Sequence, residues 1–520
     1  MVSSAKGPDE IAGDPVAAFD GVHLKSAVDE ILNRRPAIGL AVGVVRNGSL
    51  EFFHGHGVAD LESRAPITEH TAFRVASITK TFTAIAVMQL WEQGLVDLDA
   101  PANNYLRAYR LIPLDTAWHP ATLRHLLTHT AGLPEVAHLN GVFAPDFGES
   151  VEAGQPLPSL EGFYGAGLRL YAEPGSRFVY NNHGPATVGQ IVEDVSGEPL
   201  QQYFHEHIFE KLGMTESDLI RSEKVKTRLA MGYEIGSHGL KKVDERDLVT
   251  TGAASIYSTP RDMSRYLAAL LGGGSNKHGS ILKPETLATM FEAHYQPDPR
   301  IPGMGLGFFR KNLSGHLAIR HQGTLPGFHS EMCVVPDAGI GVMAFTNGGH
   351  QADFWLPAEL SYLLRRALGV AGHAPKGVPQ RPELWDDLCG WYRLSARLSD
   401  VRLRGMIGAG AEVFVRAGRL MFRFLTPIPA LAKGLPLLPD DASDPHVFRI
   451  DLPEEGLEPI RIVFGQGPSG AADRLHLDLM PVTLKRQPDN TNPRRWAATG
   501  VLGGLGVTAA AGMLRSRGRS

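Results

Sequence analysis

Two stretches with the pattern of a β-hairpin lie far apart in this chain, and they constrain its fold more than any other feature. The first covers residues 40–59, where two apolar runs flank Asn47-Gly48, a dipeptide typical of a tight primed turn. The second covers residues 332–346, and its apolar runs flank the turn sequence Pro-Asp-Ala-Gly. We predict that both hairpins belong to one sheet, so that N-terminal and C-terminal strands lie side by side.

Helical periodicity fills much of the chain between the two hairpins. Loops rich in glycine, proline and histidine separate the helical patterns. We therefore predict an α+β domain over residues 21–369, in which an antiparallel sheet is flanked by helices and an all-helical region is inserted between its strands. The clearest helical patterns cover residues 79–93, 185–196, 200–212 and 260–271.

The rest of the chain divides by composition. Residues 1–20 are dotted with Gly, Asp and Pro and are predicted to form a tail. Helical periodicity stops after Gly369, and the Pro- and Gly-rich stretch 370–382 is predicted to be a linker. Residues 383–488 contain short alternating segments separated by turns, which predicts a small antiparallel β domain. Residues 489–520 form a C-terminal tail.

The overall composition is that of an ordinary globular protein. Of 520 residues, 43% are hydrophobic and 20% are charged. The 51 Lys and Arg residues do not exceed the 55 Asp and Glu residues, so we expect no nucleic-acid partner. Cys333 and Cys389 cannot form a disulfide framework, and neither they nor the pair His54 and His56 have the spacing of a zinc site. We expect no metal and no cofactor.

The two ends of the chain indicate where in the cell the protein is expected. The N-terminal residues contain no apolar run of the length that a secretory signal needs, so we expect a cytoplasmic protein. Residues 496–514 are uncharged and framed by arginines, and as a helix they would approach the thickness of a bilayer. Their many glycines and alanines favour insertion only weakly. Two alternatives stay open: a C-terminal membrane anchor, or a flexible or docked tail.

An S-x-x-K motif from Ser77 to Lys80 opens the helix predicted at 79–93. This spacing places the serine oxygen and the lysine nitrogen on one helical face, and the helix N-terminus favours an alkoxide beside them. The lysine can therefore act as a base toward the serine. The same motif starts at Ser3 and at Ser280 in less structured surroundings, so a helix-capping serine with a solvated lysine is the alternative.

Two further motifs carry polar groups suited to catalysis. In Tyr180-Asn181-Asn182, a phenol near a lysine can relay protons, and the Asn182 carboxamide can hold both a lysine and a substrate amide. A plain turn is the alternative. In the stretch from His321 to Thr324, just before the strand predicted at 332–335, Gly323 would let a substrate lie against the backbone. His321 can donate a hydrogen bond or carry a pH-dependent charge.

In order and spacing, these three motifs resemble the serine β-lactamase and penicillin-binding superfamily. They are most similar to the class C β-lactamase-like branch, which includes D-alanyl-D-alanine carboxypeptidases, D-aminopeptidases and esterases of the same fold. The resemblance covers roughly residues 21–369 and implies a β-lactamase/transpeptidase-like fold. The β segment after Glu383 is similar to the accessory barrel of some members. Further similar stretches are residues 71–80, 122–134, 173–175, 211–215 and 254–262.

The resemblance implies a role for each motif residue. Ser77 corresponds to the nucleophile, Lys80 to its general base and Tyr180 to the proton relay to the leaving group. Asn182 corresponds to an amide that orients the substrate, and His321, Gly323 and Thr324 line the substrate site. The backbone N–H groups of Ser77 and Thr324 would form the oxyanion hole.

One position departs from the family pattern. His321 stands where many β-lactamases have the lysine of K-T-G, which binds the substrate carboxylate. A histidine is mostly neutral at neutral pH and offers a carboxylate less charge. Members with histidine here are often peptidases or esterases, which places β-lactamase activity in doubt. The chain also has no G-x-S-x-G run, so the α/β-hydrolase route to the same chemistry is not indicated.

We predict a serine hydrolase that acts through an acyl-enzyme on a small ester or amide. An esterase is favoured over a D-amino-acid peptidase, a carboxypeptidase or a penicillin-binding protein, because a chain without a secretory signal would not meet peptidoglycan. Two alternatives stay open: an acyl-binding or sensing protein of low turnover, and a scaffold. Membrane association is expected only if the C-terminal tail inserts.

Overall fold

The computed structural model describes residues 21–494 except for 139–140, 142–144, 237–238, 371–376, 395–400, 453–457 and 468–469. The tail predicted at 1–20 lies outside the described residues, and so do residues 495–520 of the tail predicted at 489–520, including the candidate transmembrane segment 496–514. No helix within the described residues is long and apolar enough to cross a bilayer.

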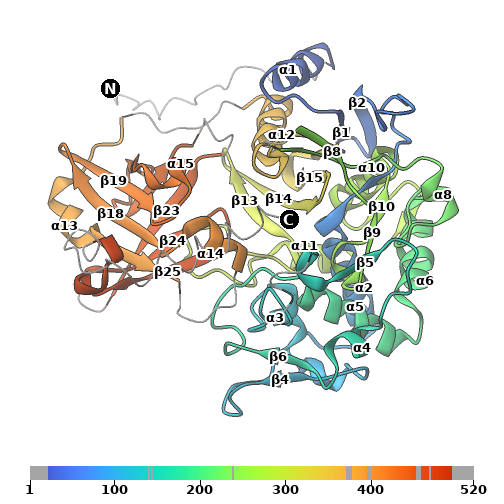
Figure 1. Ribbon diagram of the computed structural model, residues 1–520, viewed down its shortest axis with the longest axis horizontal. Helices are drawn as coiled ribbons and strands as arrows, with labels where there is room; N and C mark the ends of the chain where they lie inside the picture. Colours follow the sequence, from blue (N-terminus) through green and yellow to red (C-terminus); the bar gives the residue numbers. More distant parts are fainter. Residues whose placement is uncertain are drawn as a thin grey trace, which may run out of the picture.

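The two predicted hairpins join one antiparallel sheet of six strands, which confirms the main prediction (Figure 1). The first strand of the N-terminal hairpin pairs with the last strand of the C-terminal hairpin, and Leu40 lies opposite Thr346. Both turn residues of the first hairpin have positive φ, 52° at Asn47 and 73° at Gly48, as a primed turn requires. In spatial order the strands are β13 (Phe309–Leu313), β14 (His316–Leu325), β15 (Phe328–Val335), β16 (Ile340–Thr346), β1 (Gly39–Arg46) and β2 (Ser49–Gly57).

Helices bury both faces of this sheet. Alternate residues of one strand enter different cores: Val42 packs with α1 and α12, whereas Ala41 packs with α2 and α10. Burial on both faces explains why the strands are apolar without polar alternation. Helix α2 is buried on nearly all sides, and its only three partly exposed residues, Gln89, Trp91 and Glu92, lie near its C-terminal end. These helices are α1 (Gly21–Arg34), α2 (Thr79–Glu92), α10 (Pro260–Leu271) and α12 (Ala352–Leu368).

The region inserted between β2 and β13 is mainly helical, as predicted, and it also contains short paired strands. The sequence does not mark these strands because each spans only two to four residues. The helices are α3 (Leu123–Leu127), α4 (Leu160–Tyr164), α5 (His183–Ser196), α6 (Leu200–Phe204), α7 (Glu210–Leu212), α8 (Glu223–Lys226), α9 (Thr251–Ala254) and α11 (Pro284–Phe291). The pairs are β3 (Phe73–Arg74) with β10 (Tyr257–Ser258), β4 (Leu111–Pro113) with β6 (Leu168–Leu170), β5 (Ser150–Glu152) with β9 (Arg246–Leu248), β7 (Tyr233–Gly236) with β8 (Gly239–Lys242), and β11 (Ser275–Asn276) with β12 (Gly279–Ser280).

The C-terminal segment forms an antiparallel β domain, seen on the left of Figure 1. Its two edge strands, β20 and β21, are separated in the chain by Leu437 alone, so the sheet curls round until its edges meet, as in a barrel. The strands are β17 (Gly390–Arg393), β18 (Ala411–Arg416), β19 (Arg419–Phe424), β20 (Leu435–Pro436), β21 (Leu438–Pro439), β22 (Val447–Ile450), β23 (Ile460–Gln466), β24 (Ala472–Leu477) and β25 (Val482–Gln487). The helices are α13 (Trp385–Leu388), α14 (Val401–Ile407) and α15 (Pro429–Ala432).

The β domain packs against the first domain through apolar and charged contacts. Phe178 and Met304 of the first domain are buried in the same hydrophobic cluster as the barrel interior. Around them, Arg300 donates to Asp444 across the boundary over 3.0 Å, and Lys311 pairs with Glu458. The two domains therefore share part of one core.

Candidate active site

Ser77 and Lys80 lie together where the central helix begins. Ser77 belongs to the 3-10 turn η1 (Ala76–Ile78), which runs directly into α2. Lys80 Nζ donates a hydrogen bond to Ser77 Oγ over 2.9 Å, and the lysine is only 2% exposed whereas Ser77 is half-buried. The S-x-x-K spacing thus places an accessible hydroxyl against a buried amine.

Lys80 Nζ contacts three oxygen atoms, an arrangement that both the protonated and the neutral amine can adopt. Besides Ser77, its Nζ lies 2.9 Å from Asn182 Oδ1 and 3.1 Å from the Ala253 carbonyl oxygen. These two oxygens only accept, whereas the Ser77 hydroxyl can also donate. A neutral amine has two N–H donors and one lone pair, so it can donate to Asn182 and Ala253 while it accepts the serine proton. The site is therefore compatible with Lys80 as the base.

The backbone before Ser77 is held in a strained conformation. Ala76 has φ of 50°, which is unfavourable for a residue with a Cβ, and such strain persists only where surrounding contacts hold it. Ser330 Oγ donates to the Val75 carbonyl oxygen over 2.8 Å, and Thr79 Oγ1 donates to the Ala76 carbonyl oxygen over 2.7 Å. The turn that presents Ser77 is thus held from β15 and from α2.

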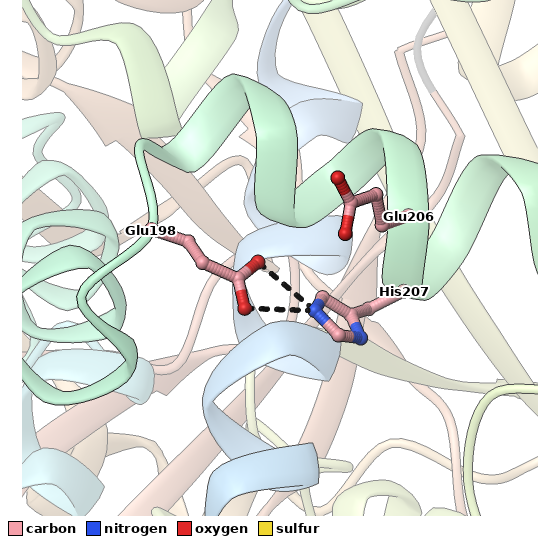
Figure 2. A group of neighbouring side chains, drawn as sticks. All are labelled: Glu198, Glu206 and His207. Carbon is pink, nitrogen blue, oxygen red and sulfur yellow. Dashed lines mark hydrogen bonds and ion pairs between the residues drawn. The ribbon is translucent and has the colours of Figure 1, made fainter.

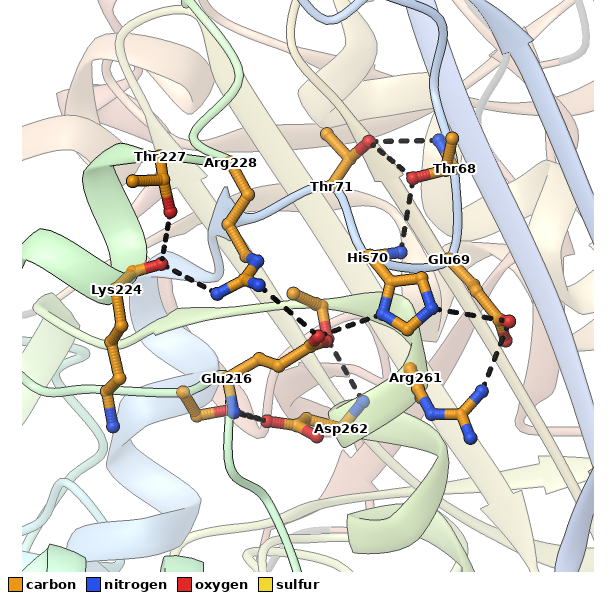
Figure 3. A network of polar contacts seen from close by, with 12 residues as sticks. Thr68, Glu69, His70, Thr71, Glu216, Lys224, Thr227, Arg228, Arg261 and Asp262 are labelled. Atoms are coloured by element: carbon orange, nitrogen blue, oxygen red, sulfur yellow. Dashed lines mark hydrogen bonds and ion pairs between the residues drawn. The ribbon is translucent and has the colours of Figure 1, made fainter.

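A polar network anchors the segment that leads into this turn (Figure 3). His70 Nδ1 contacts Glu216 over 2.8 Å, and the backbone N–H of Glu216 donates to Asp262 over 2.7 Å. Arg261 pairs with Glu69 over 3.1 Å. Asp262 is wholly buried near the start of α10, so this network links the segment before β3 to a helix of the sheet layer.

Tyr180 lies over Lys80 within a cluster of aromatic rings. The centroid of its ring is 5.0 Å from Lys80 Nζ and 4.6 Å from the ring of His129. His129 is buried, and burial lowers its pKa well below the usual value, so this imidazole is neutral beside Lys80. Tyr180 is half-buried and also packs against Phe309 of β13. The second motif therefore does meet the first, as the sequence analysis expected.

The stretch from His321 to Thr324 lies within a strand, not before one. The stretch is part of strand β14. This strand contains polar residues and a glycine, so its sequence does not show the alternation that would predict a strand. A Cβ on Gly323 would lie 2.2 Å from the Val75 carbonyl oxygen, so this glycine lets β14 pack against the turn that carries Ser77. The structure thus gives Gly323 a packing reason besides room for a substrate. The next residue, Thr324, is exposed.

His321 is buried and electrically neutral. Its side chain is 1% exposed, and burial, helped by the charge of Lys80, lowers its pKa to about 3. Its Nδ1 lies 2.8 Å from the carbonyl oxygen of Gln322, which only accepts, so Nδ1 carries the proton. Its Nε2 is then a bare acceptor, and it has no hydrogen-bond partner within the described part of the chain. The expected pH-dependent charge is therefore absent near neutral pH.

The sequence analysis missed Glu149 and His129, which also contact site residues. Glu149 is buried and accepts a hydrogen bond from Asn182 Nδ2 over 3.0 Å. No motif marks Glu149, since it lies in a loop before β5 and reaches Asn182 only through the tertiary fold. His129 lies in the stretch 122–134 that carried the resemblance, and its position was the only signal available.

Among the described residues, one group of three side chains could hold a metal ion: Glu198, Glu206 and His207 (Figure 2). Glu206 and His207 belong to the π-helical turn η5 (His205–Phe209), and Glu198 precedes α6. His207 Nε2 already contacts Glu198 Oε2 over 3.0 Å. This group is partly solvent-exposed and none of its members contacts a motif residue, so we assign it no part in the site.

Comparisons with known proteins identify the family of this chain. The sequence model of the family described as Beta-lactamase matches residues 24–364. The chain belongs to the β-lactamase family. Relatives of this family differ in activity: Esterase EstB of Burkholderia gladioli is 27% identical over 396 residues, covering 68% of this chain and 96% of that protein. The D-aminopeptidase of Gluconobacter oxydans (strain 621H) is 26% identical over 418 residues, covering 79% of this chain and 71% of that protein.

Solved structures show the same fold beyond the β-lactamase domain. The penicillin-binding protein homologue from Pyrococcus abyssi, described as octameric, aligns with a TM-score of 0.59 and 24% identity. The alignment covers 89% of this chain and 99% of that one. The family matches thus include hydrolases with ester and peptide substrates, and a fold that extends into the C-terminal β domain.

Proposed function

We propose that this protein is a serine hydrolase that forms an acyl-enzyme on Ser77 and acts on small esters. The hydrogen bond of 2.9 Å between Lys80 Nζ and Ser77 Oγ, in a member of the β-lactamase family, is the observation that carries the proposal. Removal of the serine proton by an adjacent base turns a weak nucleophile into an effective one.

The proposed reaction gives each group the role that the family resemblance implies. Lys80 Nζ takes the hydroxyl proton of Ser77 while Oγ bonds to the carbonyl carbon of the substrate. The backbone N–H groups of Ser77 and Thr324 stabilise the oxyanion, and such donors are worth about 3–4 kcal/mol each. Tyr180 relays the proton from Lys80 to the leaving oxygen as the bond between carbon and leaving group breaks. Water then attacks the acyl-enzyme and restores the Ser77 hydroxyl.

The hydrogen-bonding chemistry of His321 favours an uncharged substrate. A carboxylate has only acceptor oxygens, and His321 Nε2 is itself a bare acceptor. The two cannot share a hydrogen bond unless the imidazole takes up a proton, which its pKa of about 3 opposes. This argues against recognition of penicillins and of peptides with a terminal carboxylate. An uncharged ester avoids the conflict.

A D-aminopeptidase is the second candidate. The Gluconobacter oxydans D-aminopeptidase resembles a larger share of this chain, 79%, than EstB does. A low-turnover protein that stalls as the acyl-enzyme would use the same groups.

Intact-protein mass spectrometry separates these activities. Wild type and Ser77→Ala are incubated briefly with a p-nitrophenyl ester, a D-amino-acid p-nitroanilide and a penicillin. We expect ester turnover that depends on Ser77 and no penicillin adduct. Turnover of the anilide alone would support the aminopeptidase, and an adduct without turnover would support an acyl-binding protein. A Ser77-dependent penicillin adduct would contradict the substrate argument from His321.

A further inference from the structure

We propose that Glu149 is a positioning residue that fixes the orientation of the Asn182 carboxamide and thereby the hydrogen bonding of Lys80. The proposal rests on the role proposed above for Ser77 and Lys80. Asn182 bonds to both Glu149 and Lys80, and the effect proposed here passes through this amide.

Hydrogen bonds hold both the carboxylate and the backbone of Glu149. Its Oε2 accepts hydrogen bonds from Asn182 Nδ2 over 3.0 Å and from Thr250 Oγ1 over 3.2 Å. Its backbone carbonyl oxygen accepts from the N–H of Val249 over 2.8 Å, and its backbone N–H donates to Asp146 over 3.0 Å. Because Glu149 is only 2% exposed, water does not compete freely for this carboxylate.

A carboxylate determines which way an asparagine amide faces. It has only acceptor oxygens, so it selects the NH₂ end of Asn182. The carbonyl end, Oδ1, then faces Lys80 and accepts from Nζ over 2.9 Å. The reverse orientation would place the NH₂ group against the donors of Lys80 and the amide oxygen against the carboxylate. Both contacts would be repulsive, so Glu149 excludes this orientation.

A second layer of polar groups supports Glu149. His183 Nε2 lies 3.5 Å from its other oxygen, Oε1, and His183 is fully buried. His183 Nδ1 contacts the hydroxyl of Tyr164 over 2.9 Å. Burial raises the pKa of Tyr164 well above its usual value, so Tyr164 stays a phenol. The chain of contacts from Tyr164 to Lys80 joins α4 and α5 to α2.

The orientation of the Asn182 carboxamide also affects how a substrate can bind. One hydrogen of the Asn182 NH₂ group is donated to Glu149. The second hydrogen is not used in this bond and can be donated elsewhere. Asn182 is half-buried, so this hydrogen can reach a carbonyl oxygen of a bound acyl group. Glu149 thus keeps both ends of Asn182 in the arrangement that the acylation step uses.

The test compares variants of the full-length protein that differ in the acceptor at position 149. Glu149→Gln keeps an acceptor oxygen for Asn182, whereas Glu149→Met has similar volume and none. We expect Glu149→Met to lower the acylation rate constant for a p-nitrophenyl ester roughly 10- to 100-fold, with KM changed less than kcat. We expect Glu149→Gln to stay within about threefold of wild type.

Glu193→Ala is the matched control. Glu193 is a partly buried carboxylate near the other end of α5 that accepts from the backbone N–H of Leu200 and has no contact with Asn182. Thermal unfolding of each variant confirms folding, and Glu149→Ala replaces Glu149→Met if the latter does not fold. Full activity in the variant without an acceptor, or equal loss in Glu149→Gln, would overturn the proposal. An inactive wild type would instead overturn the proposed function.

Discussion

At the scale of single residues, the site depends on a lysine that contacts three oxygen atoms and lies beside the ring of Tyr180. Ser77, Asn182 and Ala253 surround Lys80 Nζ within 3.1 Å, and the nearby imidazole of His321 is neutral. This arrangement gives the amine two acceptors and one hydroxyl that can donate to it.

Lys80→Ala should reduce acylation by orders of magnitude without loss of the fold, because no other described base contacts Ser77 Oγ. Pre-steady-state release of p-nitrophenol measures this rate. Lys283→Ala is the control, since Ser280 and Lys283 share the S-x-x-K spacing but Lys283 is exposed. An unchanged burst in Lys80→Ala would refute the role of Lys80 as base.

His321 should make folding less favourable in acid. Its pKa is about 3 in the folded protein and about 6.5 in an unfolded chain, so only the unfolded chain takes up a proton between these values. Stability from the buried imidazole is complete above pH 6.5 and is lost as the pH falls toward 3. By pH 5 the loss relative to His321→Gln should be about 2 kcal/mol. Urea unfolding of both proteins at pH 7.5 and pH 5 tests this, and a pH-independent difference would contradict it.

At the scale of elements, the site forms where a strand and a helix N-terminus approach closely. Strand β14 lies against η1 because Gly323 has no side chain, and Ser330 of β15 bonds to the carbonyl oxygen of Val75 in the same place. The sheet therefore determines where Ser77 lies. This also explains why a residue with φ of 50°, Ala76, is tolerated beside Ser77.

Gly323→Ala should lower both activity and stability. The added Cβ would lie 2.2 Å from a backbone oxygen, which cannot rotate away, so η1 must shift. Overpacking of this kind costs about 1–3 kcal/mol, and displacement of Ser77 should lower kcat more than it changes KM. Kinetics and thermal unfolding measure both effects. Gly236→Ala is the control, because a Cβ there meets no atom within 4 Å and wild-type values are expected.

At the scale of the whole molecule, the C-terminal barrel and the site share a core. Phe178 is buried in the barrel's hydrophobic cluster, and Tyr180 packs against that cluster two residues further on. Phe178 also stacks with Tyr295 and contacts the edge of Phe309, which lies beside Tyr180. We infer that the barrel supports the segment that positions Tyr180.

Phe178→Ala should therefore reduce catalysis as well as stability. Loss of a buried phenylalanine costs about 3–5 kcal/mol. Phe424→Ala is matched to it, because Phe424 is buried in the same cluster but lies on β19, inside the barrel. Both variants should unfold at lower urea concentration, and only Phe178→Ala should lower kcat in the folded protein. Equal kcat values in the two variants would show that the barrel does not support Tyr180.

The sequence by itself determined the features that depend on local pattern. The turn at Asn47-Gly48 requires positive φ at two residues, and the helix at 260–271 begins at Thr259 with its capping oxygen bonded to the N–H of Asp262. The spacing from Ser77 to Lys80 lies within one helical turn, so helix geometry alone places the two functional groups together, without any tertiary contact.

Only the tertiary structure decided what faces these groups. Glu149 reaches Asn182 from a loop, and the ring of His321 loses its charge because packing removes it from water. Neither effect leaves a sequence pattern, since both depend on side chains brought together from distant segments. The strand β14 was missed for the related reason that its identity is set by its neighbours in the sheet and not by its own alternation.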